Sequence, residues 1–377
     1  MEFRDLKKQY QLHKEDIDKT IHDVITHANY IMGNQVTMLE KELEEYVGVK
    51  HCVTVANGTD ALQLALMTWR IGAGDAVFVP DFTFFSSGEV VSALGATPIF
   101  VDIDEETYNV DTDSLEQAII RVKEKGSLTP RVIVAVDLFG QPANFVVIRE
   151  LAQKYGLLIL EDAAQGFGGS IGTQKACSFG DISTTSFFPA KPLGCYGDGG
   201  AVFTDNDEWA ELLRSFRVHG KGRDKYDNVR IGMNSRLDTI QAAVLREKLR
   251  FFDEEIESCN EVAKEYIKRL GEYVKTPAIL QGMRSSWAQF TVCLDNEKQR
   301  EQVMGRLKEN GIPSAIYYPK PMHKQEAFRD VLSEQYSCPV TESICRRCLS
   351  IPMHAYLSKD EITQISDIFI SETNAGC

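Results

Sequence analysis

Short apolar segments alternate with helical segments from residue 51 to residue 160. This alternation constrains the fold most, because strands separated by helices of this length run parallel in one sheet with helices on both of its faces. We therefore predict an α/β fold built on a mostly parallel sheet. The predicted strands are residues 51–55, 76–80, 97–101, 132–136 and 157–160, and the predicted helices between them are residues 59–69, a stretch from about 86, 113–124 and 145–155.

The segments on either side of this alternation complete the predicted architecture. Apolar residues recur at three- and four-residue steps from Leu12 to about Val47, so we expect helices before the sheet. After it we expect strands at 182–188 and 199–204, a helix at 207–216 and a long helix from about Arg236 to Asn260. The rest predicts a smaller α+β unit, with strands at 287–293 and 314–318 and helices at 296–310, 339–348 and 359–371. We place a large domain at residues 1–250 and a small C-terminal domain at residues 251–377.

The net charge of the chain limits the kinds of molecule that it can bind. The chain has 41 Lys and Arg residues against 55 Asp and Glu residues, a net charge of −14, which works against binding to a phosphate backbone. No apolar run approaches the roughly 20 residues that a membrane helix needs, and the first ten residues are charged, unlike a signal peptide. We therefore expect a cytoplasmic protein whose partners include neither nucleic acid nor membrane.

The cysteines predict neither disulfides nor a metal centre. Their number is nine, an odd count, and most lie in apolar or mixed stretches, as small buried residues do. Cys345 and Cys348 form a C-x-x-C pair near Cys338, but no second pair or histidine cluster completes a zinc site. We expect reduced thiols and no bound metal.

Three segments carry residues suited to chemistry. The first is Asn57-Gly58-Thr59-Asp60, which joins a predicted strand to a predicted helix. Free backbone N–H groups at the positive end of a helix dipole suit a phosphate. The same four residues are also compatible with simple capping of the helix by Thr59 or Asp60.

The other two segments supply a carboxylate and an amine. Asp162 ends an apolar strand, at the edge of the sheet where α/β proteins bind ligands, although an Asp there can also cap a helix. Lys191 follows a strand and lies among Pro, Gly and small residues, and such a lysine can form a Schiff base when its surroundings lower its pKa. A phosphate site, a carboxylate and an amine together can hold pyridoxal 5′-phosphate.

Five motifs extend this interpretation to a family. Together with IPMHAYL at 351–357, they resemble the DegT/DnrJ/StrS nucleotide-sugar aminotransferases, and the resemblance covers nearly the whole chain. It implies the aminotransferase fold type I, with a mostly parallel seven-stranded sheet in the large domain and a smaller C-terminal α+β domain. The motifs are ANGTDALQLAL (56–66), PDFTFFSS (80–87), LEDAAQGFG (160–168), TSFFPAKPLGCYGDGGA (185–201) and GMNSRLDTIQAA (232–243).

The resemblance also implies roles for cofactor-binding residues. Lys191 would carry pyridoxal phosphate and move a proton, while Asp162 would pair with the ring nitrogen. Gln165 would bind the ring hydroxyl and Phe84 would stack on the ring. The residues implied to hold the phosphate are Gly58, Thr59 and Ser186, with Asn234 reaching it from a partner subunit in a homodimer with shared active sites.

The implied reaction is amino transfer from L-glutamate to a keto sugar nucleotide, for polysaccharide or glycoconjugate biosynthesis. Two motifs are most similar to members that act on UDP-linked 3-keto N-acetylhexosamines or their uronic acids. Arg236 is the candidate for the carboxylate of glutamate, since a guanidinium binds a carboxylate in bidentate fashion. Two alternative functions remain open. One is amino transfer at C4 of a dTDP- or UDP-4-keto-6-deoxyhexose, and the other is a non-catalytic regulatory role. The residues implied to line the sugar-nucleotide cleft are Tyr317, Tyr318, His323, Tyr30 and Glu89.

Overall fold

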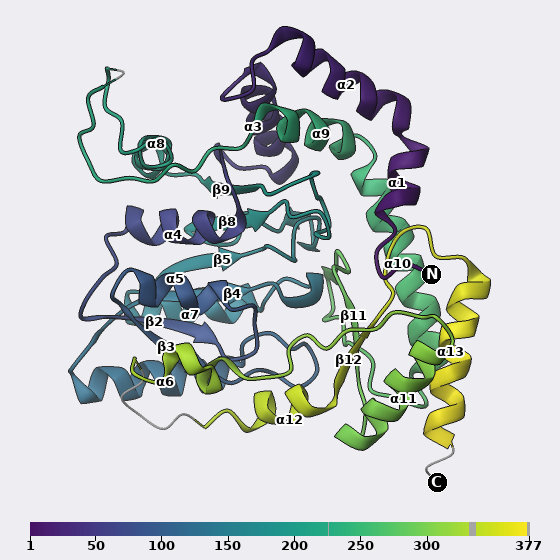
Figure 1. Ribbon diagram of the computed structural model, residues 1–377. Coiled ribbons are helices and arrows are strands. Elements are labelled where there is room, and N and C mark those ends of the chain that lie inside the picture. The colour runs from purple at the N-terminus through teal and green to yellow at the C-terminus, as the bar shows by residue number, and fades with distance from the viewer. Residues whose placement is uncertain (225, 332–336, 375–377) are drawn as a thin grey trace.

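A seven-stranded sheet forms the centre of the molecule in the computed structural model, which describes residues 1–224, 226–331 and 337–374 (Figure 1). Its strand order is β1-β9-β8-β5-β4-β2-β3. Neighbouring strands pair in parallel from β8 to β3, while β9 runs antiparallel to both β1 and β8, so the predicted mostly parallel sheet is confirmed. The strands are β1 (His51–Val55), β2 (Asp75–Pro80), β3 (Thr97–Val101), β4 (Thr129–Val136), β5 (Leu158–Asp162), β8 (Ile182–Ser186) and β9 (Gly200–Thr204).

Helices cover both faces of this sheet, as the alternation predicts. Residues of one strand point to the two faces in turn, so Phe78 packs into one core and its neighbours Val77 and Val79 into the other. The first core also takes side chains from α3 (Asn34–Val47), α6 (Thr112–Lys125), α7 (Phe145–Tyr155) and α9 (Thr239–Leu249). The second takes them from α4 (Gly58–Thr68), α5 (Ser86–Ala93) and α8 (Asp207–Phe216).

The long helix predicted from Arg236 to Asn260 is wrong. The structure has two helices there, α9 and α10 (Phe252–Leu270), with a break at Phe251. Phe251 stacks on His13 with ring centroids 3.4 Å apart, whereas Phe252 is buried in the first core against Phe167. The chain changes direction between these two aromatic residues, which lets α10 leave the large sheet and pack in a separate core.

That third core belongs to a smaller α+β unit. Buried side chains from Cys259 to Phe369 form it, and it contains the antiparallel pair β11 (Phe290–Cys293) and β12 (Cys348–Ile351). The predicted strand at 314–318 is wrong, because only an isolated bridge from Ala315 to Ser350 is found among the described residues, and Pro313 and Pro319 offer no N–H donors for a longer ladder. The helices of this unit are α10, α11 (Glu297–Glu309), α12 (Pro339–Arg347) and α13 (Lys359–Asn374).

The division at residue 250 stays a prediction, and residues 332–336 and 375–377 of the predicted small domain lie outside the described residues. The eight cysteines at described positions are unpaired and buried, while Cys377 is outside that part of the chain. Among the described residues, we find no helix with both the length and the apolar character needed to cross a membrane.

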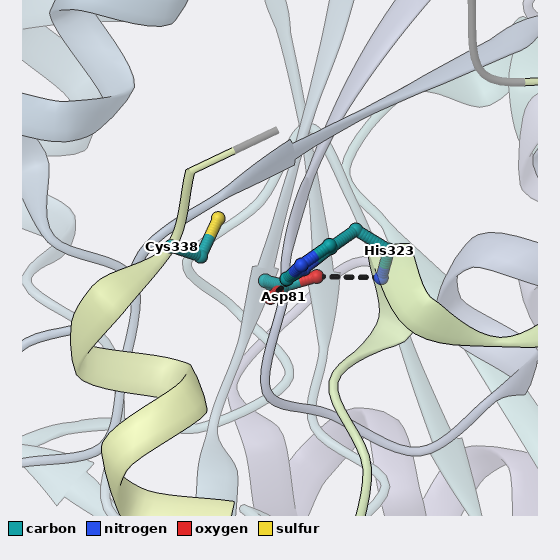
Figure 2. A group of neighbouring side chains, drawn as sticks. All are labelled: Asp81, His323 and Cys338. Atoms are coloured by element: carbon teal, nitrogen blue, oxygen red, sulfur yellow. Dashed lines mark hydrogen bonds and ion pairs between the residues drawn. The ribbon is translucent and has the colours of Figure 1, made fainter. Parts of the chain in front are cut away.

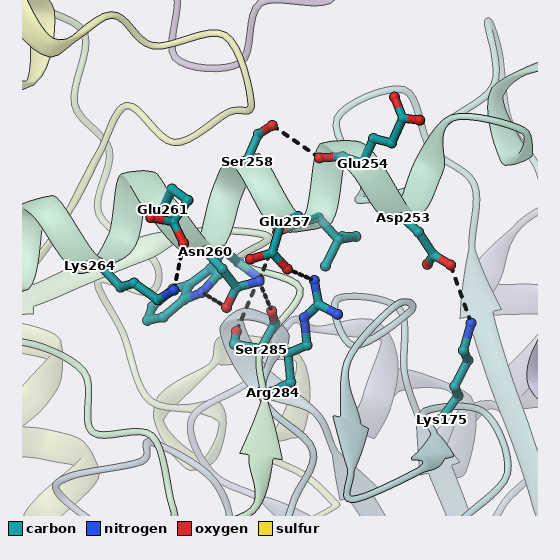
Figure 3. Close-up of polar contacts among 12 residues, drawn as sticks. Lys175, Asp253, Glu254, Glu257, Ser258, Asn260, Glu261, Lys264, Arg284 and Ser285 are labelled. Atoms are coloured by element: carbon teal, nitrogen blue, oxygen red, sulfur yellow. Dashed lines mark hydrogen bonds and ion pairs between the residues drawn. The ribbon is translucent and has the colours of Figure 1, made fainter.

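Polar contacts fasten α10 to a small sheet of three strands, β10-β6-β7 (Figure 3). Arg284 Nη2 lies 2.6 Å from Glu257 Oε2, and Lys175 Nζ lies 3.8 Å from Asp253 Oδ2. Asn260 Nδ2 donates to the carbonyl of Ser285 at 3.2 Å. These contacts join the first half of α10 to the small sheet and to the residue that follows β10. The small strands are β6 (Ser170–Ile171), β7 (Gln174–Lys175) and β10 (Met283–Arg284).

Residues 3–8 join parts of the chain that are far apart in sequence. They precede and begin α1 (Leu6–Leu12), which is followed by α2 (Lys14–His27). The carbonyl of Phe3 accepts a hydrogen bond from Met353 N at 3.1 Å, and Lys8 Nζ donates to the carbonyl of Tyr356 at 3.4 Å. Arg4 Nη2 donates to the carbonyl of Pro192 at 3.2 Å, next to Lys191.

Candidate active site

The structure brings Lys191 and Asp162 together at the carboxyl edge of the sheet. Asp162 ends β5 and is buried; its oxygens accept hydrogen bonds from Ser87 Oγ at 2.8 Å and Ala164 N at 3.2 Å. Burial raises the pKa of Asp162, and these bonds and the charge of Lys191 oppose that rise. Burial lowers the pKa of Lys191 to about 8, against the attraction of Asp162 and with a smaller contribution from the charge of Arg4.

Two cationic side chains hold the loop that carries Lys191 by hydrogen bonds to its backbone carbonyl groups. Lys248 Nζ, which is buried, donates to the carbonyl of Gly194 at 2.8 Å, and Arg4 donates to that of Pro192. Burial lowers the pKa of Lys248 to about 8. The turn is tight, since a Cβ on Gly194 would lie 2.4 Å from the carbonyl oxygen of Pro189. The Lys191 amine has no hydrogen-bond or ion-pair partner within the part of the chain that the structure describes, so it is available to a ligand.

The start of α4 and the end of β8 form a small polar cradle. A Cβ on Gly58 would lie only 2.7 Å from Ser186 Cβ, so the helix end fits against the strand only because residue 58 is glycine. Thr59 Oγ1 lies 2.7 Å from Ser86 Oγ. Asn57 caps the helix, accepting from Asp60 N at 2.8 Å, and this leaves the Thr59 hydroxyl facing Ser86. The first turn of α4 therefore presents hydroxyl groups and helix N–H groups together, as a phosphate requires.

Gln165 joins the edge of the sheet that carries Asp162 to Tyr318. Its Oε1 accepts from Phe139 N at 2.7 Å, which orients the amide so that Nε2 donates to the Tyr318 hydroxyl at 3.0 Å. The ring of Tyr318 lies 6.4 Å from that of Phe84, centroid to centroid. Phe84 is 54% exposed beside Tyr318, which suits an aromatic side chain that stacks on a ligand. Tyr317 is half-buried and packs against Phe3.

His323 lies in a buried ion pair (Figure 2). Its Nδ1 is 2.6 Å from Asp81 Oδ2, and its Nε2 is 3.4 Å from Glu342 Oε1. Cys338 contributes a thiol to the same cluster, and one ligand atom from each of Asp81, His323 and Cys338 lies within 4.8 Å of the others. Because the imidazole and the carboxylate bond directly to each other, we describe the cluster as an ion pair with a thiol beside it.

The remaining predicted residues lie around this centre. Asn234 is exposed and Arg236 is half-buried; their neighbour Ser235 accepts a hydrogen bond from Ala56 N at 3.1 Å, so this segment lies beside the turn between β1 and α4. Arg236 has no ion-pair partner among the described residues. Glu89 is exposed on α5. Tyr30 is 46% exposed, and its carbonyl accepts from Thr239 N.

Sequence reasoning missed several residues of the site. Ser86 and Ser87 begin α5, after the loop that follows β2, and two hydroxyls at the start of a predicted helix were an available signal. Lys248 and Arg4 had no such signal, because each looks like an ordinary exposed cation in its local sequence. Their contacts depend on residues 54 and 188 positions away along the chain.

These residues fit pyridoxal phosphate. An unpartnered amine of lowered pKa suits its aldehyde, and a buried carboxylate suits its ring nitrogen. The cradle that a Cβ on Gly58 would fill suits its phosphate, and the exposed ring of Phe84 suits its ring face. All the parts lie along one edge of the sheet, where α/β folds bind ligands.

Comparisons with known proteins agree with this site. The model of the DegT/DnrJ/EryC1/StrS aminotransferase family matches residues 11–369. UDP-2-acetamido-2-deoxy-3-oxo-D-glucuronate aminotransferase of Pseudomonas aeruginosa is 46% identical over 96% of this chain and 97% of its own length. UDP-N-acetyl-3-dehydro-alpha-D-glucosamine 3-aminotransferase of Acidithiobacillus ferrooxidans is 40% identical over 97% of this chain and 95% of its own length.

A solved structure gives the same result for the fold. The crystal structure of a DegT DnrJ EryC1 StrS aminotransferase from Brucella abortus superposes with a TM-score of 0.96 and 47% identity, covering 98% of this chain and 99% of that one. Sequence, fold and site geometry therefore lead to one conclusion: the chain belongs to the DegT/DnrJ/EryC1/StrS aminotransferase family.

Proposed function

We propose that this chain transfers an amino group from L-glutamate to the 3-keto group of a UDP-linked N-acetylhexosamine or its uronic acid. The observation that carries the proposal is the placement of the unpartnered Lys191 amine near the buried Asp162 carboxylate, which Ser87 holds by a hydrogen bond at the sheet edge. The substrate class is supported by the names of the two relatives above, both of which act on UDP-linked 3-keto sugars.

The cofactor is pyridoxal phosphate. When bound, it supplies an aldehyde for the amino group and a ring that accepts the electron pair left by proton removal. We assign its phosphate to Gly58, Thr59 and Ser186, which lie close together. Phe84 would cover one face of the ring, and Gln165 would lie beside it.

Two side chains of the protein move or hold protons in this proposal. Lys191 Nζ, with a pKa near 8, is partly neutral at physiological pH, so it can take the proton from the Cα of glutamate and return one to the acceptor. Asp162 would accept a hydrogen bond from the protonated ring nitrogen of the bound cofactor and so keep that proton in place. Its hydrogen bond from Ser87 favours the ionised carboxylate that this role requires.

The amino donor and the assembly complete the proposal. Arg236 is half-buried without an ion-pair partner in the described part of the chain, which suits a residue reserved for the carboxylate of glutamate. We also propose a cytoplasmic homodimer in which Asn234 reaches the phosphate of the partner subunit. Support for an interface comes from the nearby loop, where Val229 is 54% and Ile231 is 89% exposed.

The decisive test is an absorbance spectrum of the purified protein with pyridoxal phosphate, followed by addition of L-glutamate. We expect a visible to near-ultraviolet band that shifts to the pyridoxamine form, and Lys191→Ala should lose both the band and turnover. The matched control is Lys154→Ala, which removes an exposed lysine paired with Glu116. Near-normal turnover by Lys191→Ala would contradict the assignment.

The acceptor is identified next, with panels of UDP- and dTDP-linked keto sugars. Amino transfer to a 3-keto UDP sugar supports the proposal, whereas transfer to a 4-keto-6-deoxyhexose alone would favour the C4 reaction. If no band forms and borohydride reduction leaves Lys191 unmodified, the chain is a regulatory homologue without turnover.

A further inference from the structure

Met322 and His323 together make three hydrogen bonds to Asp81, two of them from His323. Asp81 directly follows β2 and is fully buried. Its backbone carbonyl accepts from Met322 N at 2.9 Å and its Oδ1 accepts from His323 N at 2.8 Å. The His323 ring completes the set through Nδ1 and Oδ2 at 2.6 Å. A segment that follows the small unit's residue Ala315 is thus attached to the large sheet at its carboxyl edge.

The charges around the ring favour the protonated imidazole. The groups that face it are Asp81, Glu342 and the Cys338 thiol, with Lys324 bound to the far oxygen of Glu342 at 2.6 Å. Burial lowers the pKa of His323, but the hydrogen bond and charge of Asp81, helped by Glu342, outweigh burial and raise it. Burial, with the charges of Asp81 and Asp102, raises the pKa of Cys338, so its thiol keeps its proton.

The same segment carries a side chain into the active site. Tyr318, five residues before His323, accepts a hydrogen bond from Gln165. Its ring lies 5.9 Å from that of Phe82, which is adjacent to Asp81 in the sequence, and 6.4 Å from that of Phe84. The segment 318–323 is therefore held by Asp81 at one end and lies beside Gln165 and Phe84 at the other.

We infer that His323 is a positioning residue: its ion pair with Asp81 holds the segment 318–323 so that Tyr318 stays against Gln165 and Phe84, on the side of the site that receives the sugar nucleotide. His323 thus acts through Tyr318 rather than by touching the substrate. The inference rests on the proposed function, because the sugar nucleotide is the substrate whose binding the segment would govern.

The first test measures the segment itself and needs no turnover. We would compare hydrogen–deuterium exchange at the Met322 amide in the wild-type protein and in His323→Asn, both carrying cofactor. Removing the charge from a buried pair should speed this exchange by at least about tenfold. The matched control is His51→Asn, which removes a histidine from a more exposed pair with Asp207 of the same 2.6 Å length. Unchanged exchange in His323→Asn would overturn the inference.

The second test measures what the positioning does. In His323→Asn the KM for the keto sugar nucleotide should rise at least about tenfold, while the rate of the glutamate half-reaction stays within about twofold. In the wild type this KM should also rise as pH increases through the pKa of His323, because the ion pair is lost, and His323→Asn should remove that rise. Equal losses for both substrates would overturn the inference.

A double variant separates positioning from a folding defect. If the pair acts as one unit, Asp81→Asn should reproduce the exchange and KM of His323→Asn, and combining the two should add nothing further. Additive effects of the two substitutions would overturn the inference. An exchange rate that responds to Zn²⁺ in the wild type but not in His323→Asn would also overturn it, because that result would identify a metal site. Failure of the wild type to use any UDP-linked keto sugar would instead contradict the proposed function, and the exchange test would still report on the pair.

Discussion

Ser87 Oγ donates a hydrogen bond of 2.8 Å to Asp162 Oδ2 and so ties the first turn of α5 to the end of β5. Burial raises the pKa of Asp162, and this bond is the largest of the interactions that oppose the rise. The ionised state of Asp162 therefore depends on a side chain from a neighbouring strand–helix connection, and the dependence can be measured.

Replacing Ser87 by Ala should slow the glutamate half-reaction about fivefold, the equivalent of roughly 1 kcal/mol for one hydrogen bond to a buried group. The acidic limb of the pH–rate profile should also move to higher pH, because the pKa of Asp162 rises further without the bond. Ser92→Ala is the control in the same helix, since the Ser92 hydroxyl is buried without a hydrogen-bond partner among the described residues. A profile identical to that of the wild type would contradict the prediction.

Asp162→Asn should retain the cofactor but slow proton removal from glutamate by at least about a hundredfold, because a neutral amide does not stabilise the protonated ring nitrogen. Stopped-flow absorbance after mixing with glutamate measures this rate. Asp75→Asn, which removes a carboxylate paired with Arg131 at the start of β2, should leave it unchanged. A rate within about threefold of wild type, about 0.7 kcal/mol at the barrier, would count against the assigned role.

Gly58→Ala should weaken cofactor binding at least about tenfold, because the added Cβ would lie 2.7 Å from Ser186 Cβ and must push the cradle open. Titration of the apoprotein with pyridoxal phosphate gives the dissociation constant. Gly305→Ala is the matched control in α11, where the new Cβ meets open space. That variant should bind normally and be more stable by up to about 1 kcal/mol, as expected for Ala in a helix. Equal dissociation constants for the two variants would exclude the cradle as the phosphate site.

The apoprotein should become more stable when Lys191 is replaced by Met, and the gain should depend on pH. The pKa of Lys191 is lowered from 10.5 to about 8 in the folded state, so below pH 8 the buried charge costs up to about 3 kcal/mol. As pH rises from about 8 to about 10.5 the folded state releases the proton first, and the cost disappears. Urea unfolding of both proteins across this pH range measures the difference in their free energies of unfolding. The shifted pKa of Lys248 affects both proteins equally and so does not contribute to that difference. A difference that does not change with pH would contradict the prediction.

Much of the fold follows from periodicity in the sequence. Strands such as 51–55 and 97–101 were predicted at their observed bounds, because apolar runs between helical stretches leave few alternatives. The break at Phe251 was not predictable, since it accompanies two long-range contacts, Phe251 on His13 and Phe252 against Phe167. The segment 314–318 has strand composition, but it lacks a partner beyond Ala315.

Some residues of the candidate site could likewise be predicted from the local sequence, and others could not. Lys191, Asp162 and Gly58 each carry a local signal, because they lie at strand ends or in a turn rich in small residues. The surroundings of His323 carry none: Asp81 is 242 residues away along the chain, so only the folded chain reveals that this histidine is buried against a carboxylate. Long-range pairs of this kind decide how a side chain is used, and local sequence does not encode them.

The contacts of residues 3–8 join the Lys191 loop to a residue near the other end of the described chain. Arg4 reaches the loop of Lys191, while its neighbour Phe3 bonds to Met353, a separation of 350 positions. Closing a contact over so long a stretch of chain is slow, and during synthesis it must wait until residue 353 has left the ribosome. The segment 3–8 therefore gains its full set of contacts late in synthesis, so the contacts that hold Arg4 beside the Lys191 loop are completed only when residue 353 is available.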